Sequence, residues 1–451
     1  MPGEKKGKRL FGTNGVRGVV GGAMTPALAL SIGLALGSMR RGKIAVGRDT
    51  RTSGPALASA LKGGLLATGC DVTDCGILPT PALQYLVQEH FDAGAVITAS
   101  HNPPEYNGVK VIEPDGTEMG DEATIELEGH IFANDVPLAP WSGAGREVAA
   151  PHLVHEYIDA VVRRFPPGIG EGITVAVDPG CGAACGTTPA ILTRLGCRVF
   201  TINGQMDGRF PGRLPEPSPD GLIPLGELVR ETGAALGIAH DGDADRAVFL
   251  DEQGSYIEEN REFALVADQV CRERKGMVVM PVSTSRLVEI IAQRNGCGVR
   301  YTPVGSISVA RTMRALREGG TPVAFGGEGN GGLIYPDHQF CRDGGMTAAM
   351  MIAILAREKR PLSSLVAALP GFSLIAEKIR GKDPGALIER LVCAYAHESL
   401  DRTDGIRINR ENSWALIRPS GTEPLVRVIV ESPNHETARA FFTEILQILD
   451  Q

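Results

Sequence analysis

Three carboxylates of this chain are spaced so that they could bind a cation together. Asp241, Asp243 and Asp245 occupy every second position of a short run that ends at Arg246. Carboxylates held so close repel one another unless a hard cation compensates their charge. Mg²⁺ commonly engages carboxylate and phosphate oxygens at the same time. We therefore expect a divalent metal site at this run, with Mg²⁺ as the first candidate.

Two other interpretations of the acidic run stay open. A calcium loop of the EF-hand type would place a ligand at Glu252, but Arg246 stands where that loop needs glycine. The residues that follow, Ala247–Leu250, are typical of a strand rather than of calcium ligands. A plain acidic turn in contact with solvent is the second alternative.

A serine on a stiff turn is the candidate nucleophile. Ser100 lies in the run TASHNPP, in which Pro103 and Pro104 exclude a helix. Lys110 follows ten residues later and could supply a cation or a proton. The adjacent His101 allows a serine hydrolase, although the chain has no Gly-x-Ser-x-Gly elbow. A simple turn residue is the alternative role for Ser100.

Two later loops offer polar groups to a phosphorylated sugar. Glu328 and Asn330 stand among five glycines, which let the backbone approach a ligand closely. The second run, RPSGTEPLVR, combines guanidinium, hydroxyl and backbone N–H donors that suit a phosphate: Arg418, Ser420, Gly421, Thr422 and Arg427. Flexible or solvated surface turns are the alternatives. With the nucleophile and the metal run, these loops indicate phosphoryl transfer on a phosphosugar.

The elements that position these loops follow one plan that repeats three times. Each copy has a β-branched strand, a polar turn, a helix, a second strand, a further helix and a third strand. The first strands are expected at residues 43–46, 173–177 and 277–280, and the third strands at 93–97, 235–239 and 322–325. Ligand sites of open α/β sheets form at the carboxyl ends of strands, so the loops after the third strands should share one cleft.

The remainder of the chain departs from this plan and indicates a smaller α+β domain. The expected fold class is α/β, with three similar α/β domains that have mixed, largely parallel sheets, followed by the α+β C-terminal domain. We place the boundaries at 1–148 for the serine loop, 149–255 for the metal loop, 256–366 for the sugar loop and 367–451 for the phosphate loop.

The composition excludes several classes of protein. Lys and Arg number 45 against 53 Asp and Glu, a net charge of -8, and aromatic residues make up 5%. Such a chain lacks the basic field and the stacking surface of a nucleic-acid binder. The most apolar early stretch, residues 27–39, is too short to span a bilayer. Nine scattered cysteines suit a reducing compartment, so we expect a cytoplasmic enzyme with no nucleic-acid or membrane partner.

The motifs together resemble the α-D-phosphohexomutase superfamily, which includes phosphoglucomutase/phosphomannomutase and phosphoglucosamine mutase. FGTNGVRG begins at Phe11, and TASHNP, DGDADR and RPSGTEP follow in the order of that superfamily. The resemblance implies a four-domain, heart-shaped enzyme around a central cleft. It implies phosphoryl transfer from a phosphoserine at Ser100, through a sugar bisphosphate intermediate that also activates the enzyme.

The resemblance also assigns roles to individual residues. Mg²⁺ would be held by Asp241, Asp243 and Asp245 with a phosphate oxygen on Ser100. The groups expected at the reacting phosphate are Arg17, His101, Lys110 and Arg246, with Lys110 as general acid/base. Glu328 and Asn330 would bind the sugar, and the other phosphate would be held by Arg418, Ser420, Gly421, Thr422 and Arg427.

The preferred sugar is the least determined expectation. Enzymes of glucose and mannose phosphates usually show Gly-Glu-x-Ser-Gly-His, where this chain has GEGNGG from Gly327, and a histidine where Val304-Gly305-Ser306 stands here. The sequence favours glucosamine phosphate, with glucose, mannose and pentose phosphates as alternatives. A metal-dependent sugar phosphatase and a non-catalytic phosphosugar-binding protein are rivals of other classes, and the chain could be a monomer or a homodimer.

Overall fold

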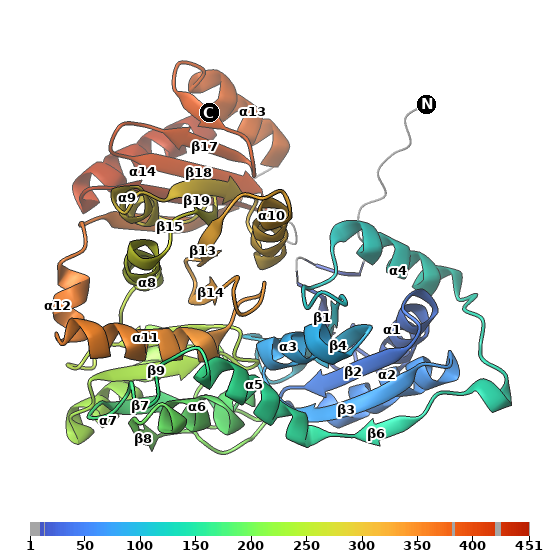
Figure 1. Ribbon diagram of the computed structural model, residues 1–451. Helices are drawn as coiled ribbons and strands as arrows, with labels where there is room; N and C mark the ends of the chain where they lie inside the picture. Colours follow the sequence, from blue (N-terminus) through green and yellow to red (C-terminus); the bar gives the residue numbers. More distant parts are fainter. Residues whose placement is uncertain (1–9, 13, 381–383, 420–424, 451) are drawn as a thin grey trace. The chain divides into compact units, whose positions relative to one another are not determined.

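The computed structural model describes residues 10–12, 14–380, 384–419 and 425–450 of the chain. The chain divides into two compact units (Figure 1). The first unit holds the chain up to residue 262 together with 330–366, and the second holds 263–329 and the chain from 367 onward. Helix α8 (Glu259–Glu273) continues across the first of these boundaries.

The first sheet of the first unit has the strand order β1-β5-β4-β2-β3-β6. Its central strands are parallel, and the two strands at one edge, β5 and β1, run antiparallel to their neighbours. The strands are β1 (Val16–Val19), β2 (Lys43–Arg48), β3 (Asp71–Ile77), β4 (Ala93–Ile97), β5 (Tyr106–Ile112) and β6 (Glu147–Ala149). The helices are α1 (Pro26–Met39), α2 (Gly54–Ala67), α3 (Thr80–His90) and α4 (Asp121–Ala133).

Strand β5 differs from the loop that the sequence suggested for this stretch. Val109 and Val111 lie in the hydrophobic core of the first sheet. Since side chains alternate along a strand, Lys110 between them points to the opposite face. The strand therefore delivers a lysine from a buried backbone rather than from a loop.

The second sheet of the first unit has the order β10-β9-β7-β8. Strand β7 is parallel to β8 and β9, whereas β10 is antiparallel to β9. The elements here are β7 (Thr174–Asp178), β8 (Arg198–Thr201), β9 (Leu236–His240), β10 (Ala247–Leu250), α5 (Val154–Val162), α6 (Thr188–Arg194) and α7 (Ile223–Thr232). Further along the chain, the first unit also contains β14 (Gly332–Ile334), α11 (Gly344–Glu358) and most of α12 (Leu362–Ala367).

The second unit combines the third copy of the plan with the C-terminal segment. Strands β12, β11 and β13 are parallel neighbours, and the antiparallel C-terminal sheet has the order β15-β19-β18-β17-β16. The elements are β11 (Met277–Pro281), α9 (Arg286–Arg294), β12 (Gly298–Thr302), α10 (Ser306–Glu318), β13 (Val323–Glu328), β15 (Ser373–Arg380), α13 (Pro384–Ala394), β16 (Ser399–Asp401), β17 (Ile406–Asn409), β18 (Trp414–Pro419), β19 (Leu425–Ser432) and α14 (His435–Asp450).

A buried arginine joins the two sheets of the second unit. The guanidinium of Arg407 on β17 lies 4.6 Å from the ring centroid of Tyr301 and 4.3 Å from that of Trp414. It also donates to the carbonyl oxygen of Val282, at 3.0 Å. The aromatic faces and the carbonyl compensate the buried charge.

The threefold plan predicted from the sequence is confirmed. In each copy the first strand lies between the second and the third, as β3-β2-β4, β8-β7-β9 and β12-β11-β13. The runs TASHNP and DGDADR lie at the carboxyl ends of β4 and β9, where the sequence placed them. Helix α13 ends at Ala394, before residue 399, where the sequence pattern placed its end.

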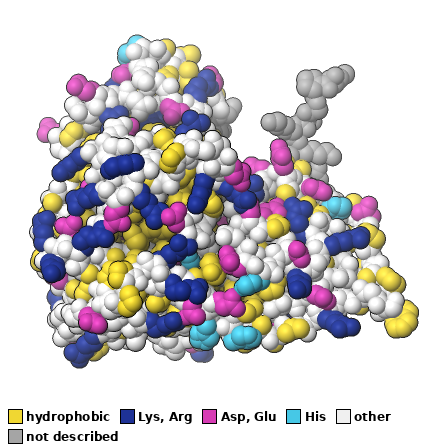
Figure 2. Space-filling view, viewed as in Figure 1, with side chains coloured by type: hydrophobic (Ala, Val, Ile, Leu, Met, Phe, Trp, Pro, Cys, Tyr) yellow, Lys and Arg dark blue, Asp and Glu magenta, His cyan; other side chains and the backbone are white. Residues whose placement is uncertain are grey.

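The surface and the helices agree with the composition. Lys and Arg side chains lie interspersed with Asp and Glu over the visible face (Figure 2). Among the described residues, none of the helices has both the length and the apolar character needed to cross a membrane.

Two neighbouring glycines of α2 provide a test of the packing of the first unit. Helices α1 and α2 pack against each other, and a Cβ atom at Gly64 would lie 2.5 Å from the carbonyl oxygen of Leu30. A Cβ at Gly63 would meet nothing within 4 Å. We predict that Gly64→Ala destabilises the fold by about 1–3 kcal/mol through overpacking.

Gly63→Ala is the matched control and should stabilise the same helix by about 0.5–1 kcal/mol, because alanine loses less backbone entropy. Thermal unfolding of both variants measures the difference. A Gly64→Ala variant as stable as the parent would show that the two helices are not packed this closely.

Candidate active site

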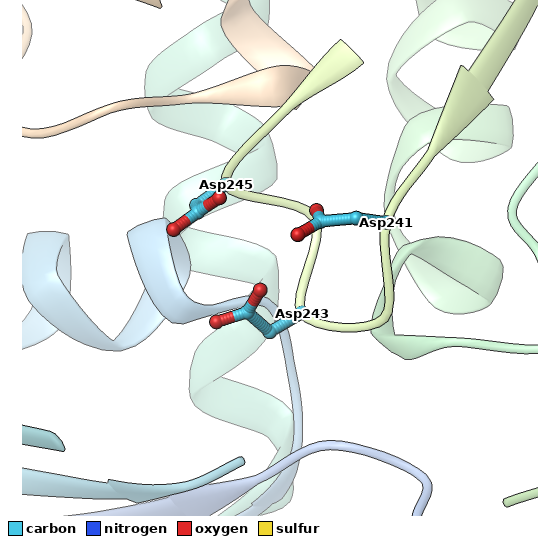
Figure 3. Close-up of side chains that lie close together, drawn as sticks. All are labelled: Asp241, Asp243 and Asp245. Atoms are coloured by element: carbon cyan, nitrogen blue, oxygen red, sulfur yellow. The ribbon is translucent and has the colours of Figure 1, made fainter. Parts of the chain in front are cut away.

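The three predicted carboxylates converge at the turn between β9 and β10 (Figure 3). One oxygen atom from each of Asp241, Asp243 and Asp245 lies within 4.8 Å of the other two, and all three residues are buried. The turn is compact, and Ala244 at its centre has a φ of 56°. The chain thus brings three acids together with at most 2% of each exposed to solvent.

Buried cations compensate this negative charge. Lys110 Nζ lies 2.8 Å from Asp243 Oδ2 and 3.2 Å from Asp245 Oδ2. Arg342 donates to Asp245, and Arg246 Nε lies 3.3 Å from Asp241 Oδ2. In the absence of these partners, burial of three like charges would be prohibitive.

The three carboxyl groups differ in their affinity for protons. Burial raises the pKa of Asp241 to about 7, because the charges of Asp245 and Asp243 add to the effect of burial and Arg246 offsets only part of it. Burial also acts against ionisation of Asp243, but Lys110 and the hydroxyl of Thr80 hold its pKa well below the usual range. Burial acts on Asp245 as well, and Arg342 and Lys110 lower its pKa.

The acid cluster fits a magnesium ion. Asp243 Oδ1 and Asp245 Oδ1 are buried and accept no hydrogen bond from the described residues. Hard oxygen ligands of this kind are those that Mg²⁺ prefers, usually with additional oxygens from phosphate or water. Asp241, Asp243 and Asp245 are therefore suited to hold the ion that the sequence predicted.

Ser100 lies directly beside this cluster. Its hydroxyl donates a hydrogen bond of 2.7 Å to Asp241 Oδ2, although the two residues are 141 positions apart. A Cβ atom at Gly242 would lie 2.5 Å from the Ser100 carbonyl oxygen, so only glycine permits the two loops to approach this closely. Ser100 itself has a φ of 50°, a left-handed conformation that is uncommon for residues with a side chain.

The other predicted groups of the first unit surround Ser100. His101 Nδ1 lies 3.4 Å from Ser100 Oγ, and burial together with the charge of Arg246 lowers the pKa of His101 to about 4. Arg17 donates to the Ala99 carbonyl oxygen at 3.2 Å and to Asn102 Oδ1 at 3.1 Å. The imidazole is therefore neutral at physiological pH and can accept a proton.

Sequence patterns did not single out several residues that complete this arrangement. Thr80, the first residue of α3, donates to Asp243 Oδ2 at 2.6 Å. Glu216 accepts both ends of the Arg246 guanidinium, at 3.0 and 2.9 Å. Arg342 precedes the capping residue of α11, Asp343. The flanking prolines of Glu216 were the only local signal, because the partners are distant in sequence.

The predicted sugar-binding residues lie in different units. Glu328 ends β13 in the second unit and is 7% exposed. Asn330 belongs to the first unit, where its Oδ1 accepts a hydrogen bond of 3.2 Å from the backbone N–H of Gly332. Each is available in its own unit as a polar group on a glycine-rich turn.

The phosphate-binding residues that the structure describes form a row of cations. Arg418 and Arg427 are direct partners on β18 and β19, and Lys378 on β15 is the partner of Arg427. Like charges on directly opposed positions are destabilising unless an anion compensates them. Asp404 lies 3.1 Å from Arg418, whereas Lys378 and Arg427 are exposed. The predicted Ser420, Gly421 and Thr422 lie outside the described residues.

Metal binding at Asp241 should depend on pH. A carboxyl group must lose its proton to bind Mg²⁺, and the pKa of Asp241 is raised to about 7. Below pH 7 the apparent affinity for Mg²⁺ should therefore fall about tenfold per pH unit, and calorimetric titration between pH 6 and 8 measures it.

The same shift affects stability without metal. Since the folded state holds the Asp241 proton up to about pH 7 and the unfolded chain releases it near 4, stability should fall as the pH rises through this window. Asp241→Asn is the control, in which the pH dependence of Mg²⁺ affinity should disappear. Equal affinity of the parent at pH 6 and pH 8 would contradict the prediction.

Comparisons with known proteins agree with this site. Four profiles of one family match successive parts of the chain. They are described as phosphoglucomutase/phosphomannomutase alpha/beta/alpha domains I, II and III and the C-terminal domain, and they match residues 8–137, 155–254, 258–372 and 376–448. Together they cover most of the sequence.

Full-length relatives point to the same family. The chain is 42% identical to a phosphoglucomutase/phosphomannomutase of Thermococcus kodakarensis, covering 98% of this chain and 99% of the relative. It is 41% identical to a protein of Methanopyrus kandleri named probable phosphoglucosamine mutase, covering 98% of each. A crystal structure of a phosphoglucomutase/phosphomannomutase family protein from Burkholderia thailandensis matches with a TM-score of 0.88 and 28% identity, over 98% of this chain and 97% of the other.

The domain profiles, the full-length identities and the buried acid cluster lead to one conclusion. The chain belongs to the phosphoglucomutase/phosphomannomutase family of the α-D-phosphohexomutase superfamily, and it is a phosphohexomutase, an isomerase that acts on phosphorylated sugars.

Proposed function

We propose that this phosphohexomutase interconverts glucosamine 1-phosphate and glucosamine 6-phosphate through a phosphoserine at Ser100. The observation that carries the proposal is the 2.7 Å hydrogen bond between Ser100 Oγ and Asp241 within a buried cluster of acids and cations. This arrangement places a hydroxyl nucleophile next to the groups that can neutralise a transferring phosphoryl group.

The reaction has two balanced halves. In the first, the phosphoryl group leaves Ser100 Oγ for the free hydroxyl of the sugar monophosphate. One P–O bond breaks and another forms, and the hydroxyl proton ends on Ser100 Oγ. In the second half, the other phosphate of the resulting bisphosphate returns to Ser100 by the reverse exchange. The sugar leaves with its phosphate on the other position.

Residues of the first unit have distinct tasks in this scheme. Lys110 and His101 carry the exchanged proton, since one is an ammonium held among carboxylates and the other a neutral imidazole. Arg17 and Arg246 place positive charge near the reacting oxygens. When bound by Asp241, Asp243 and Asp245, Mg²⁺ supplies further charge stabilisation for the transferring group.

The second unit contributes groups for the rest of the substrate. Arg418 and Arg427, with Lys378 beside them, are suited to hold the phosphate that is not being transferred. Residues 420–422 are part of this proposal on sequence grounds. Glu328 offers a carboxylate that accepts hydrogen bonds from hydroxyl or ammonium groups of a sugar.

The choice of glucosamine phosphate has two supports. The Methanopyrus kandleri relative carries the name of a phosphoglucosamine mutase, and the run from Gly327 lacks the serine and histidine usual in glucose and mannose enzymes. The Thermococcus kodakarensis relative is named for glucose and mannose phosphates, which are therefore the second candidates.

Removing the Ser100 hydroxyl tests the phosphoserine. We predict that Ser100→Ala abolishes incorporation of phosphate into the protein and lowers turnover by at least about 10³-fold, because the nucleophile is lost. Intact-mass spectrometry and coupled turnover assays measure the two effects. Ser31→Ala is the control, since the Ser31 hydroxyl donates to the Ala27 carbonyl within α1, and it should leave both unchanged. Full turnover in Ser100→Ala would exclude the assignment.

Phosphorus NMR tests the substrate and the reaction class together. The protein with Mg²⁺ receives glucosamine, glucose, mannose or ribose 1-phosphate, each with a trace of the matching bisphosphate. We expect the isomeric phosphate to accumulate fastest with glucosamine phosphate. A faster reaction with another sugar would overturn the substrate, and release of free phosphate alone would indicate a phosphatase.

A further inference from the structure

The backbone of the Ser100 loop converges on one buried arginine. Arg51 is fully buried, and its side chain follows the end of β2. Its NH2 group donates to the carbonyl oxygens of Ser100 and Asn102, at 2.8 and 2.6 Å. Its NH1 group donates to the carbonyl oxygens of Pro103 and Tyr106, at 2.6 and 2.8 Å. Four carbonyl groups of one loop thus share a single guanidinium.

The fifth donor of Arg51 links it to the other side of the loop. Its Nε donates to Asp49 Oδ2 at 3.0 Å, and the same oxygen accepts the hydroxyl of Thr98 at 2.7 Å. The Thr98 hydroxyl oxygen in turn accepts the backbone N–H of Ser100 at 2.9 Å. All five N–H donors of the guanidinium are therefore used. A lysine has only three donors and no planar fork, so it could not replace this set.

A segment from the second sheet covers this arrangement. The guanidinium of Arg51 lies 5.3 Å from the ring centroid of Phe210. A Cβ atom at Gly208 would lie 2.1 Å from the carbonyl oxygen of Thr50, so this segment rests directly on the backbone beside Arg51. Water is excluded, and a hydrogen bond lost here would not be replaced by solvent.

The conformation of Ser100 explains why such a support is needed. A φ of 50° is unfavourable for a residue with a Cβ and persists only where the surroundings hold it. Ser100 is held on both sides, at its N–H through Thr98 and at its carbonyl through Arg51. The direction of its hydroxyl toward Asp241 depends on this backbone conformation.

We propose that Arg51 is a positioning residue for phosphoryl transfer, which fixes the Ser100 backbone so that Oγ faces the acid cluster. This inference rests on the proposed function of Ser100. Arg51 touches neither the acid cluster nor, in the proposed reaction, the substrate, and it acts through the loop alone.

A second arginine of the first unit provides a matched comparison. Arg213 donates to Asp178 Oδ2 at 2.8 Å and to the carbonyl oxygen of His240 at 2.6 Å, immediately before the acid run. It is 8% exposed and also bonds mainly to backbone carbonyl groups. Arg51 thus supports the serine loop, whereas Arg213 supports the metal loop.

The experiment compares Arg51→Lys with Arg213→Lys in the full chain. Arg51→Lys should lower kcat and the rate of phosphoserine formation about 100-fold, because displacement of a reacting atom by about 1 Å has this effect. KM for the sugar phosphate, the Mg²⁺ concentration for half-maximal activity and the thermal midpoint should stay close to parent values. Arg213→Lys should instead raise the Mg²⁺ requirement. Arg51→Ala should regain part of its lost kcat when guanidinium ion is added at millimolar concentration.

Three results would contradict the inference. Parental kcat in Arg51→Lys would show that the arginine is not needed to aim Ser100. Equal losses in kcat and Mg²⁺ affinity, or failure of guanidinium to restore Arg51→Ala, would indicate general damage to the fold. If the parent protein itself turns over phosphosugars without phosphoserine, the proposed role of Ser100 fails, and that result is distinct from a failure confined to Arg51.

Discussion

Burial of three carboxylates in one turn is the constraint on which the active site depends. Asp241, Asp243 and Asp245 cannot remain ionised away from water unless positive charge is brought to them. The first unit meets this requirement with a lysine from β5 and arginines from two other segments. The cluster is therefore both a source of strain and the reason that distant parts of the chain meet.

The repeated α/β plan gives these groups a common place. Because β4 and β9 occupy equivalent positions in their sheets, the serine loop and the metal loop both start at the carboxyl end of a third strand. The third strand of each of these two copies is followed by an antiparallel strand, and β5 brings Lys110 back toward the acids. Repetition of one supersecondary unit thus supplies the nucleophile and the metal ligands without special elements.

Two arginines that take no direct part in charge compensation at the acids give the loops their shape. Arg51 and Arg213 each pair with an aspartate near the end of a first strand, Asp49 or Asp178, and direct their remaining N–H groups at carbonyl oxygens. The planar fork of arginine suits this task, since it can bind several carbonyl groups in fixed directions. Loops that carry chemistry are thereby held as firmly as the strands that precede them.

The sequence by itself determined the α/β plan, the order of the four motifs, and the identities of Ser100, the three aspartates and Lys110. These follow from local spacing, strand periodicity and turn residues, which are properties of short stretches of chain. The sequence did not show that Thr80, Glu216 and Arg342 join the cluster, or that Arg51 holds the serine loop. Only the tertiary structure decided these contacts, because each joins residues from different elements, and the energy of a buried charge depends on every neighbour that folding brings to it.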